Sequence, residues 1–372
     1  MEIPWVIEEH TKVKHQLLKS YINPWMAILF SQQKRMGFPE RLFYFDGFSG
    51  PGIYYEDNSE SSTCLGSPLI VAEIANKYLD ANSKREIILT CTDNHGGCVN
   101  MLNQKLTEMN KHEQRWKAYH AEFDTAINAI LDLIEEDGLN TSPMFFFIDP
   151  FGYSGFPLST IERILKFPQA ELFINFMIYD IIRFCEEKQF EENMEALFGC
   201  KEFKKVSALN GEEKQSYLVN LYCKQLKNVA RAEFVMPFRI NTPKQGNRPK
   251  YYLIHASKKF KALKVMKDTM AKISDSPYSF VAIGISSQES LFENPDKVSL
   301  RERISKYCQD KYPDWIDYSE IEAWTYSNTN GISKTIKEAL IALEKDNALN
   351  IKRKPRQRAN TVTEGAKIVY IG

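Results

Sequence analysis

Residues 43–52, with the sequence Phe-Tyr-Phe-Asp-Gly-Phe-Ser-Gly-Pro-Gly, constrain this chain more than any other stretch. Residues 42–45 form an apolar, aromatic run that is typical of a short buried strand. The run ends at Asp46, and three glycines follow within six residues. Such glycines allow a sharp turn and a close backbone approach to a ligand, and the acid can accept hydrogen bonds from an amine or from ribose hydroxyls. The pattern predicts either a site for a nucleotide-type ligand or a plain strand-to-loop turn.

The chain has 372 residues, which is enough for one large α/β domain and a smaller second domain. Its composition, 43% hydrophobic and 26% charged, is that of an ordinary globular protein. Lys plus Arg and Asp plus Glu number 48 each, so the net charge indicates no partner and any basic surface must be local. Seven cysteines without a Cys-x-x-Cys pair argue against a disulfide framework and a metal site, and they favour the cytoplasm. We find no signal peptide and no apolar run long enough to cross a membrane.

The first predicted helix covers residues 11–35. We expect a break near Asn23, because the residue before a proline is pushed away from helical geometry. The start of this helix is unusually polar, with the cluster His-Thr-Lys-Val-Lys-His at residues 10–15. Two interpretations stay open. The cluster is either a solvated first turn, or a functional element that covers a ligand or contacts phosphate.

A second helix and a second strand follow the glycine loop. Ser67 and Pro68 predict a helix start, with Ser67 as the N-cap. The apolar residues 87–91 predict the strand, and Asp93 lies just beyond its end. In a doubly wound sheet, an acid at this place binds ribose hydroxyls. The alternative role for Asp93 is to cap a helix that begins near Gly97.

A third strand is expected at residues 116–120, followed by an amphipathic helix. Asp124 is the expected N-cap of that helix. The two residues before it are better placed to meet an adenine. Glu122 would accept a hydrogen bond from its exocyclic amine, and Phe123 would pack on its face.

The strongest strand signal is at residues 144–148, which are all apolar. A run without alternation is typical of a strand that is covered on both faces. It ends at Asp149 and Pro150, and Tyr153 follows shortly after. A carboxylate, a carbonyl outside the ladder and an aromatic ring would converge there to hold a planar base and accept from its amino group. The alternative is a structural turn.

A fifth strand is expected at residues 170–177, where the polar Asn175 needs a partner. Residues 186–230 have a helical and charged pattern, which we interpret as an insertion. Residues 233–240 and 251–256 then predict two strands of a hairpin. Alternating strands and helices followed by a hairpin predict a parallel sheet with an antiparallel addition.

Residues 244–272 contain nine Lys or Arg and a single acid. Such a local basic stripe is either a solvated helix face or a track for nucleic-acid phosphates. The candidate phosphate contacts in it are Lys244, Arg248, Lys250, Lys258 and Lys259.

The last eighty residues predict a separate small domain, and we place the boundary between residues 290 and 291. Its expected elements are three helices and two strands, at residues 299–309, 318–326, 333–345, 349–351 and 367–371. A basic tip joins the strands and supplies further candidate nucleic-acid contacts: Arg353, Lys354, Arg356 and Arg358. This is the order of a winged helix. Such domains bind either DNA or protein, and both stay open here.

Two motifs resemble those of known methyltransferases. Asp46-x-Phe48-x-Gly50-x-Gly52 resembles the first motif of class I S-adenosylmethionine-dependent methyltransferases, with Phe where many members have the first glycine. The resemblance implies that these four residues hold the methionine end of the cofactor. Asp93 would then bind the ribose, and Glu122 or Phe123 the adenine.

Residues 149–153 resemble the Asp-Pro-Pro-Tyr motif of amino-group methyltransferases. The resemblance implies catalytic roles for Asp149, Pro150 and Tyr153. The carboxylate and the proline carbonyl would accept from the acceptor amine, and the tyrosine would stack on the base. Phe151 and Gly152 replace the second proline and add one residue, which shifts Tyr153 and weakens an assignment to the N6 of adenine.

With residues 10–15, 66–68 and 251–256, these motifs are similar to the three-Cys-motif partner protein family (TcmP), over about residues 5–275. The resemblance implies a Rossmann-like methyltransferase fold and a partner with a cysteine motif, similar to radical-type iron–sulfur enzymes. We expect methyl transfer from S-adenosylmethionine to a nucleic-acid base. Two alternatives stay open: a catalytically silent nucleic-acid-binding or protein-interaction partner, and a different enzyme that uses the same cleft.

Overall fold

The computed structural model describes residues 3–241, 251–273, 279–282, 299–329, 331–358 and 360–371. The chain forms two compact units, Met1–Phe280 and Val281–Gly372. The predicted boundary at residue 290 lies outside the described residues and stays a prediction. Among the described residues, none of the helices is long and apolar enough to span a bilayer.

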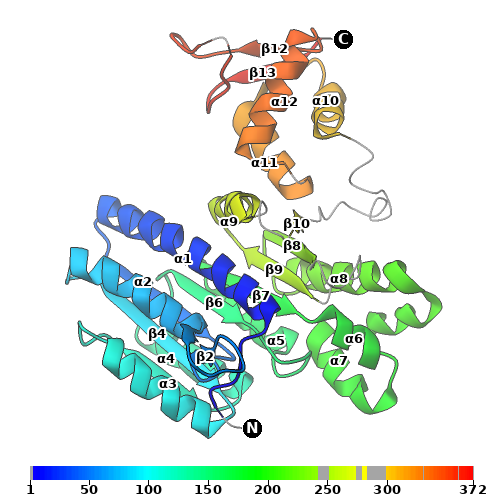
Figure 1. Cartoon of the computed structure of the whole chain (residues 1–372). Coiled ribbons are helices and arrows are strands. Elements are labelled where there is room, and N and C mark those ends of the chain that lie inside the picture. The colour runs from blue at the N-terminus through cyan, green and yellow to red at the C-terminus, as the bar shows by residue number, and fades with distance from the viewer. Residues whose placement is uncertain are drawn as a thin grey trace. The chain divides into compact units, whose positions relative to one another are not determined.

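An eight-stranded sheet forms the centre of the first unit, in the order β10-β8-β9-β7-β6-β1-β4-β5 (Figure 1). Its strands are β1 (Arg41–Asp46), β4 (Glu86–Asp93), β5 (Trp116–His120), β6 (Met144–Ile148), β7 (Ala170–Phe176), β8 (Phe234–Asn241), β9 (Tyr252–Ser257) and β10 (Ser279–Ala282). The pairs from β5 through β4, β1 and β6 to β7 are parallel, and β9 is antiparallel to both β7 and β8. This order confirms the predicted Rossmann-like sheet with a closing antiparallel hairpin. Strand β10 extends the sheet at the edge and was not predicted.

The register of the central strands brings their carboxyl ends to one edge. Asp46, the last residue of β1, pairs with Cys91 of β4 and with Phe147 of β6. Asp93 and Asp149 each lie two residues beyond these partners. Because parallel strands end at the same edge of a sheet, the topology places the three predicted acids at neighbouring positions.

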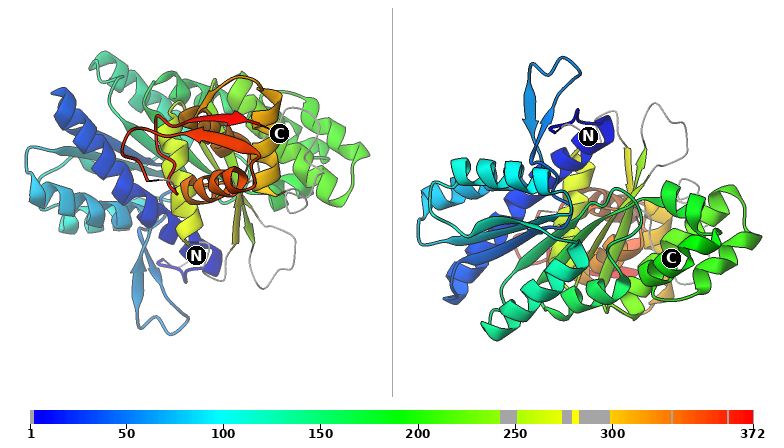
Figure 2. Two further views of the ribbon diagram at one scale, coloured as in Figure 1. Left: turned by 90° about the horizontal axis from the view of Figure 1, so that it is seen from above. Right: turned by 90° about the horizontal axis from the view of Figure 1, so that it is seen from below.

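Helices cover both faces of the sheet. They are α1 (Glu9–Met36), α2 (Ser67–Ala81), α3 (Gly96–Met109), α4 (Phe123–Glu136), α5 (Leu158–Lys166), α6 (Ile178–Phe184), α7 (Glu191–Phe198), α8 (Gly211–Asn228) and α9 (Phe260–Ile273), with 3₁₀ turns η1 (Lys188–Phe190) and η2 (Glu202–Ala208). Helices α1 and α9 lie side by side on one face, and α4 and α5 lie on the other (Figure 2). A short hairpin, β2 (Ile53–Tyr55) and β3 (Thr63–Leu65), follows β1.

The predicted break in the first helix is wrong. Helix α1 is 28 residues long and continues through Pro24 without interruption. Tyr21 and Ile22 before the proline, and Trp25 and Met26 after it, are all buried. A proline inside a helix costs about 3 kcal/mol. Fully burying one large apolar side chain gains about 1.5–3 kcal/mol, so packing on both sides of Pro24 outweighs the cost.

Two predicted helix caps are also wrong. Gly66, not Ser67, is the N-cap of α2, and the Ser67 side chain is buried within the first turn. Glu122, not Asp124, is the N-cap of α4. Asp124 lies two residues after the cap, in the first turn of the helix, and accepts a hydrogen bond from Thr160 of α5 instead.

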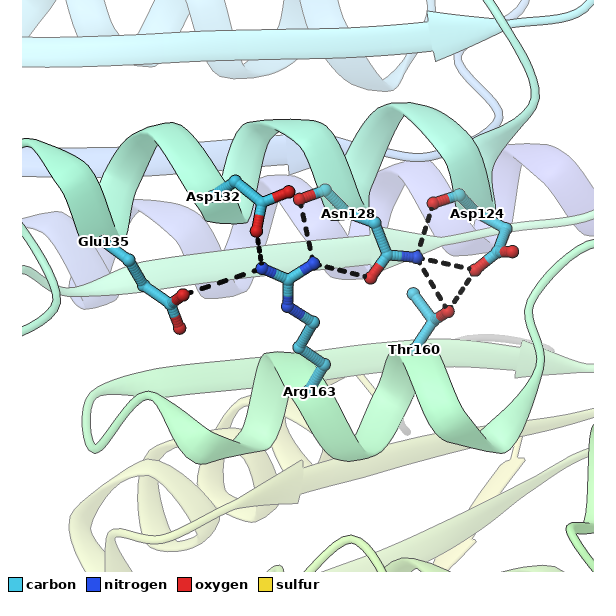
Figure 3. Close-up of polar contacts among 6 residues, drawn as sticks. All are labelled: Asp124, Asn128, Asp132, Glu135, Thr160 and Arg163. Atoms are coloured by element: carbon cyan, nitrogen blue, oxygen red, sulfur yellow. Dashed lines mark hydrogen bonds and ion pairs between the residues drawn. The ribbon is translucent and has the colours of Figure 1, made fainter.

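Helices α4 and α5 are joined by a polar network (Figure 3). Arg163 of α5 donates to the backbone oxygen of Asn128 at 3.1 Å and to its side-chain oxygen at 3.0 Å, and it pairs with Asp132 and Glu135. The hydroxyl of Thr160 donates to Asp124. The network fastens the helix that follows β5 to the helix that follows the residue 149–153 loop.

We predict that Arg163→Met lowers the free energy of unfolding by about 1–2 kcal/mol, because it removes charge-assisted hydrogen bonds at a half-buried position. Chemical denaturation measures the change. Lys166→Met removes an exposed lysine of the same helix and should change the stability by less than about 0.5 kcal/mol. Equal effects of the two changes would contradict the role of the network.

The second unit contains the predicted three helices and two strands, together with a short additional strand. Its elements are α10 (Leu300–Asp310), β11 (Ile316–Asp317), α11 (Tyr318–Asn328), α12 (Ser333–Lys345), β12 (Leu349–Lys352) and β13 (Lys367–Tyr370). The three strands form an antiparallel sheet in the order β11-β13-β12. The basic tip at residues 353–358 follows β12 directly.

Candidate functional site

Three acids lie at the carboxyl edge of the central strands: Asp46 ends β1, Asp93 ends β4 and Asp149 follows β6. All three acids affect the pKa of the Tyr54 hydroxyl. Its pKa is raised well above the ordinary value, first by burial and then by the charges of Asp149, Asp46 and Asp93. Together with the strand register, this places the acids predicted from separate parts of the sequence near one another at this edge.

The backbone conformation of the loop at residues 46–52 explains two of its glycines. Gly50 and Gly52 have positive φ angles of 58° and 78°. A Cβ at Gly50 would lie 2.9 Å from the Tyr54 hydroxyl oxygen, and one at Gly52 would lie 2.6 Å from Leu102 Cδ1. The backbone conformation and these neighbours require glycine here, whether or not a ligand approaches.

Asp93 holds this loop in place. Its Oδ2 accepts a hydrogen bond from the Gly50 N–H at 2.9 Å, and its Oδ1 accepts from the His95 N–H at 2.8 Å. The N-cap of α3 is His95, whose Nδ1 accepts from Cys98. A ribose hydroxyl at Asp93 would therefore share an oxygen with one of these N–H groups, which a carboxylate can accommodate.

The two residues expected to meet an adenine differ in exposure. Glu122 is exposed and accepts from the Asn94 side chain at 3.3 Å. Phe123 is 2% exposed and stacks on Phe48, with ring centroids 5.5 Å apart. A Cβ at Gly47 would lie 2.5 Å from Phe123, so this ring covers the loop. Glu122 is accessible to a ligand, whereas Phe123 and Phe48 pack on each other.

Asp46 is a buried carboxyl group with an unused acceptor. The Tyr44 hydroxyl donates to its Oδ2 at 3.0 Å, and Oδ1 accepts no hydrogen bond among the described residues. Burial raises the pKa of Asp46 to about 7, hydrogen bonds from the Ser67 and Tyr44 hydroxyls and the Phe48 backbone N–H oppose the rise, and Asp149 adds to it. A buried carboxyl oxygen without a donor is costly, and a ligand ammonium group would satisfy it.

Asp149 is bound by two side chains from other elements. Lys14 of α1 places its Nζ 2.6 Å from both carboxylate oxygens, and Asn175 of β7 donates to Oδ1 at 2.6 Å. The Lys14 and Asp149 side chains are 6% and 13% exposed, and Lys14 also lies 5.7 Å from the ring centre of Tyr251. Lys14 thus belongs to the site and not to a solvated turn. The polar strand residue Asn175, for which we expected a partner, has Asp149 as its partner.

His15 lies beside this ion pair and is 7% exposed. Its pKa is lowered to about 4, first by burial and then by Lys14, with Asp149 opposing. The neutral ring packs near Tyr54, at a centroid distance of 5.7 Å. His15 also lines a pocket of about 690 Å³, together with Lys12, Gln16 and residues of α2 and the β2–β3 hairpin.

The aromatic residues of the 149–153 loop are arranged differently from the motif it resembles. Tyr153 is 8% exposed and packs on Phe184 and Phe190, at centroid distances of 5.4 and 6.0 Å. Phe151 is 76% exposed and lies 6.1 Å from Trp5. Of the two rings, the exposed Phe151 is therefore better placed than the buried Tyr153 to stack on a base. Trp5 was not predicted, because it is isolated in the sequence from the other motifs.

The described part of the predicted basic stripe contains both exposed and buried lysines. Lys244, Arg248 and Lys250 lie outside the described residues. Lys258 is half-buried and Lys259 is exposed. Lys267 is 2% exposed, and burial lowers its pKa to about 7. Residues 258–272 therefore include both surface and core lysines, because α9 packs one side against α1.

The basic tip of the second unit is similarly mixed. The guanidinium of Arg353 pairs with Glu344 and donates to the Thr361 backbone oxygen at 2.9 Å, which makes it a structural residue. Lys354, Arg356 and Arg358 are exposed. Within the described ranges, His, Cys, Asp and Glu residues form no group of three or more that could hold a metal ion.

Neither a protein-family model nor a curated protein matches this sequence. Among solved structures, a Legionella pneumophila protein of the family DUF519 is 13% identical and covers 72% of this chain and 96% of its own length, with a TM-score of 0.43. The kinase-methyltransferase WbdD is 9% identical, with coverages of 68% and 40% and a TM-score of 0.32. The methyltransferase domain of METTL16 is 13% identical, with coverages of 65% and 83% and a TM-score of 0.28. TM-scores below 0.5 carry no functional conclusion, and the strand order alone establishes the fold.

We predict that Lys14→Met or Asp149→Asn alone lowers the free energy of unfolding by about 3–5 kcal/mol, because each leaves a buried partner without its counter-charge. The double variant should cost less than the sum of the two. Urea denaturation measures all three. Lys19→Met, which removes an exposed lysine 3.7 Å from Glu73, should change the stability by less than about 1 kcal/mol. Additive effects of the Lys14 and Asp149 changes would contradict a coupled pair.

Proposed function

We propose that this chain is an S-adenosylmethionine-dependent methyltransferase that acts on an exocyclic amino group of a nucleic-acid base. The observation that carries the proposal is the position of Asp46, Asp93 and Asp149 at the carboxyl ends of three adjacent parallel strands in a Rossmann-like sheet. Ligands of such sheets bind at this edge. An acidic edge is suited to a ligand with ammonium and sulfonium groups.

The residues present fit this cofactor. The unused Oδ1 of Asp46 would accept from the α-ammonium group, beside the loop of Gly50 and Gly52. Asp93 would share an oxygen with a ribose hydroxyl, and the exposed Glu122 would accept from the adenine amine. When bound, the cofactor supplies an electrophilic methyl group.

The 149–153 loop would hold the acceptor. The Asp149 carboxylate and the Pro150 carbonyl would accept from the acceptor amine and orient its lone pair, while Phe151 stacks on the base. The contribution of these residues is mainly positional.

The bidentate ion pair of Lys14 and Asp149 favours a second candidate, a catalytically silent partner that keeps the methyltransferase fold. In this arrangement Lys14 occupies the two carboxylate oxygens that an acceptor amine would need.

Transfer of tritium from labelled S-adenosylmethionine onto pools of DNA and RNA separates the two candidates. Native chain that labels neither pool, while still binding the cofactor, would support the silent partner. With an identified acceptor, Asp149→Asn should lower the rate about a hundredfold, equivalent to about 2.7 kcal/mol of barrier, with a much smaller change in cofactor affinity. Full turnover of Asp149→Asn would make the loop a structural turn.

We predict that affinity for S-adenosylmethionine falls as the pH is lowered from 7 to 5.5. The carboxyl of Asp46 has a pKa of about 7, so acid protonates it and removes its attraction for the ligand ammonium. The loss should reach up to about tenfold per pH unit. Calorimetry measures the affinity, and Asp46→Asn serves as the control that binds more weakly and without this pH dependence. A pH-independent affinity of the native chain would remove Asp46 from the cofactor site.

We further propose that the second unit is a winged helix and that its exposed tip contacts nucleic-acid phosphates. The order of three helices and a small antiparallel sheet supports the first part. The exposure of Lys354, Arg356 and Arg358 supports the second. A cytoplasmic location and a three-Cys-motif iron–sulfur partner rest on the sequence alone, and co-purification with such a neighbour tests the partner.

Changing Lys354, Arg356 and Arg358 together to Ser should flatten the salt dependence of nucleic-acid binding. Each lost phosphate contact reduces the slope of log affinity against log salt by about 0.9 for duplex DNA. Fluorescence anisotropy at several salt concentrations measures the slope. Arg353→Ser is the matched control, because its main effect should be on stability through Glu344. An unchanged slope in the triple variant would assign the tip to protein contact.

A further inference from the structure

Lys14 fills the position at Asp149 that the proposed function gives to an acceptor amine. Its Nζ lies 2.6 Å from both carboxylate oxygens, and Asn175 occupies a further position on Oδ1. An incoming amino group must therefore displace Lys14 or share the carboxylate with it.

If an amine displaces Lys14, the Lys14 ammonium group loses its counter-charge. The residue is 5% exposed, so its ammonium group would lose its carboxylate without gaining full hydration. The neighbouring groups offer little replacement. His15 is neutral at physiological pH because burial lowers its pKa, and the Tyr251 ring lies 5.7 Å away. The carboxyl group of Asp46 is affected by the charge of Asp149, but in the proposed function it binds the cofactor.

A neutral amine therefore displaces Lys14 at a large energetic cost, whereas a molecule with both an amine and an anion satisfies both partners at once. We propose that the acceptor replaces the ion pair by an exchange of partners: its amino group binds the Asp149 carboxylate, and its phosphate binds the Lys14 ammonium group. The acceptor is then recognised as a nucleotide unit, not as a free base or a nucleoside. This inference rests on the proposed function and adds Lys14 as a specificity-determining residue.

Calorimetry on the full chain tests the exchange, with S-adenosylhomocysteine present to fill the cofactor site without turnover. The probes are adenosine, cytidine and their 5′-monophosphates. At least one monophosphate should bind ten times or more as tightly as its nucleoside. Lys14→Met should reduce this ratio to below about threefold, and Lys14→Arg should retain it because the cation is kept.

The ratio is insensitive to a general loss of stability, since both ligands of a pair are measured on the same variant. Lys19→Met, on the same helix, controls for the loss of one positive charge and should leave the ratio unchanged. If Lys14→Met does not fold, the double variant Lys14→Met/Asp149→Asn, which lacks both charges, should show the same loss of discrimination.

Equal binding of nucleoside and monophosphate by the native chain would overturn the inference. So would a ratio that survives in Lys14→Met, or the absence of monophosphate binding up to about 1 mM. In these cases S-adenosylhomocysteine still binds, and the proposed function stands. Failure of S-adenosylhomocysteine to bind would instead overturn the proposed function, and this inference with it.

Discussion

The buried ion pair between Lys14 and Asp149 links helix α1 to the carboxyl edge of the sheet. Its two side chains come from α1 and from the loop after β6, which are 135 residues apart in sequence. Removal of either charge leaves the other buried and unpaired. The start of α1 and the accessibility of Asp149 therefore depend on the same interaction.

A second buried carboxylate holds the same helix further along. Glu171, near the start of β7, accepts from the Tyr21 hydroxyl at 2.5 Å and from the Trp25 indole at 3.1 Å, and His255 lies 3.5 Å away. Burial, followed by the charge of Glu171, raises the pKa of Tyr21 well above its ordinary value, so the phenol remains the donor. Helix α1 is thus anchored by Lys14 near the carboxyl edge and by Tyr21 and Trp25 near the opposite edge. This double attachment explains why it stays continuous through Pro24.

The composition and the hydrophobic pattern of the sequence predicted the fold well, because strands and helices are indicated by residues that are close together in the chain. The apolar run at residues 144–148 and the aromatic residues of β1 have no alternation, as expected for strands covered on both faces. Helix ends were predicted less well. Ser67 and Asp124 are good capping residues by type, yet both are turned inward to polar neighbours that only the assembled chain provides.

The sequence by itself determined a parallel sheet with a closing hairpin and the placement of Asp46, Asp93 and Asp149 at strand ends, because parallel strands joined by helices must end at one edge. Only the tertiary structure decided what each acid binds. Asp93 holds the glycine loop, Asp46 keeps one acceptor unused, and Asp149 is paired with a lysine from the first helix. The polar cluster at residues 10–15 pointed to a role for this segment, but the pairing of Lys14 with a residue 135 positions away depends on how a helix lies across the sheet and not on local spacing.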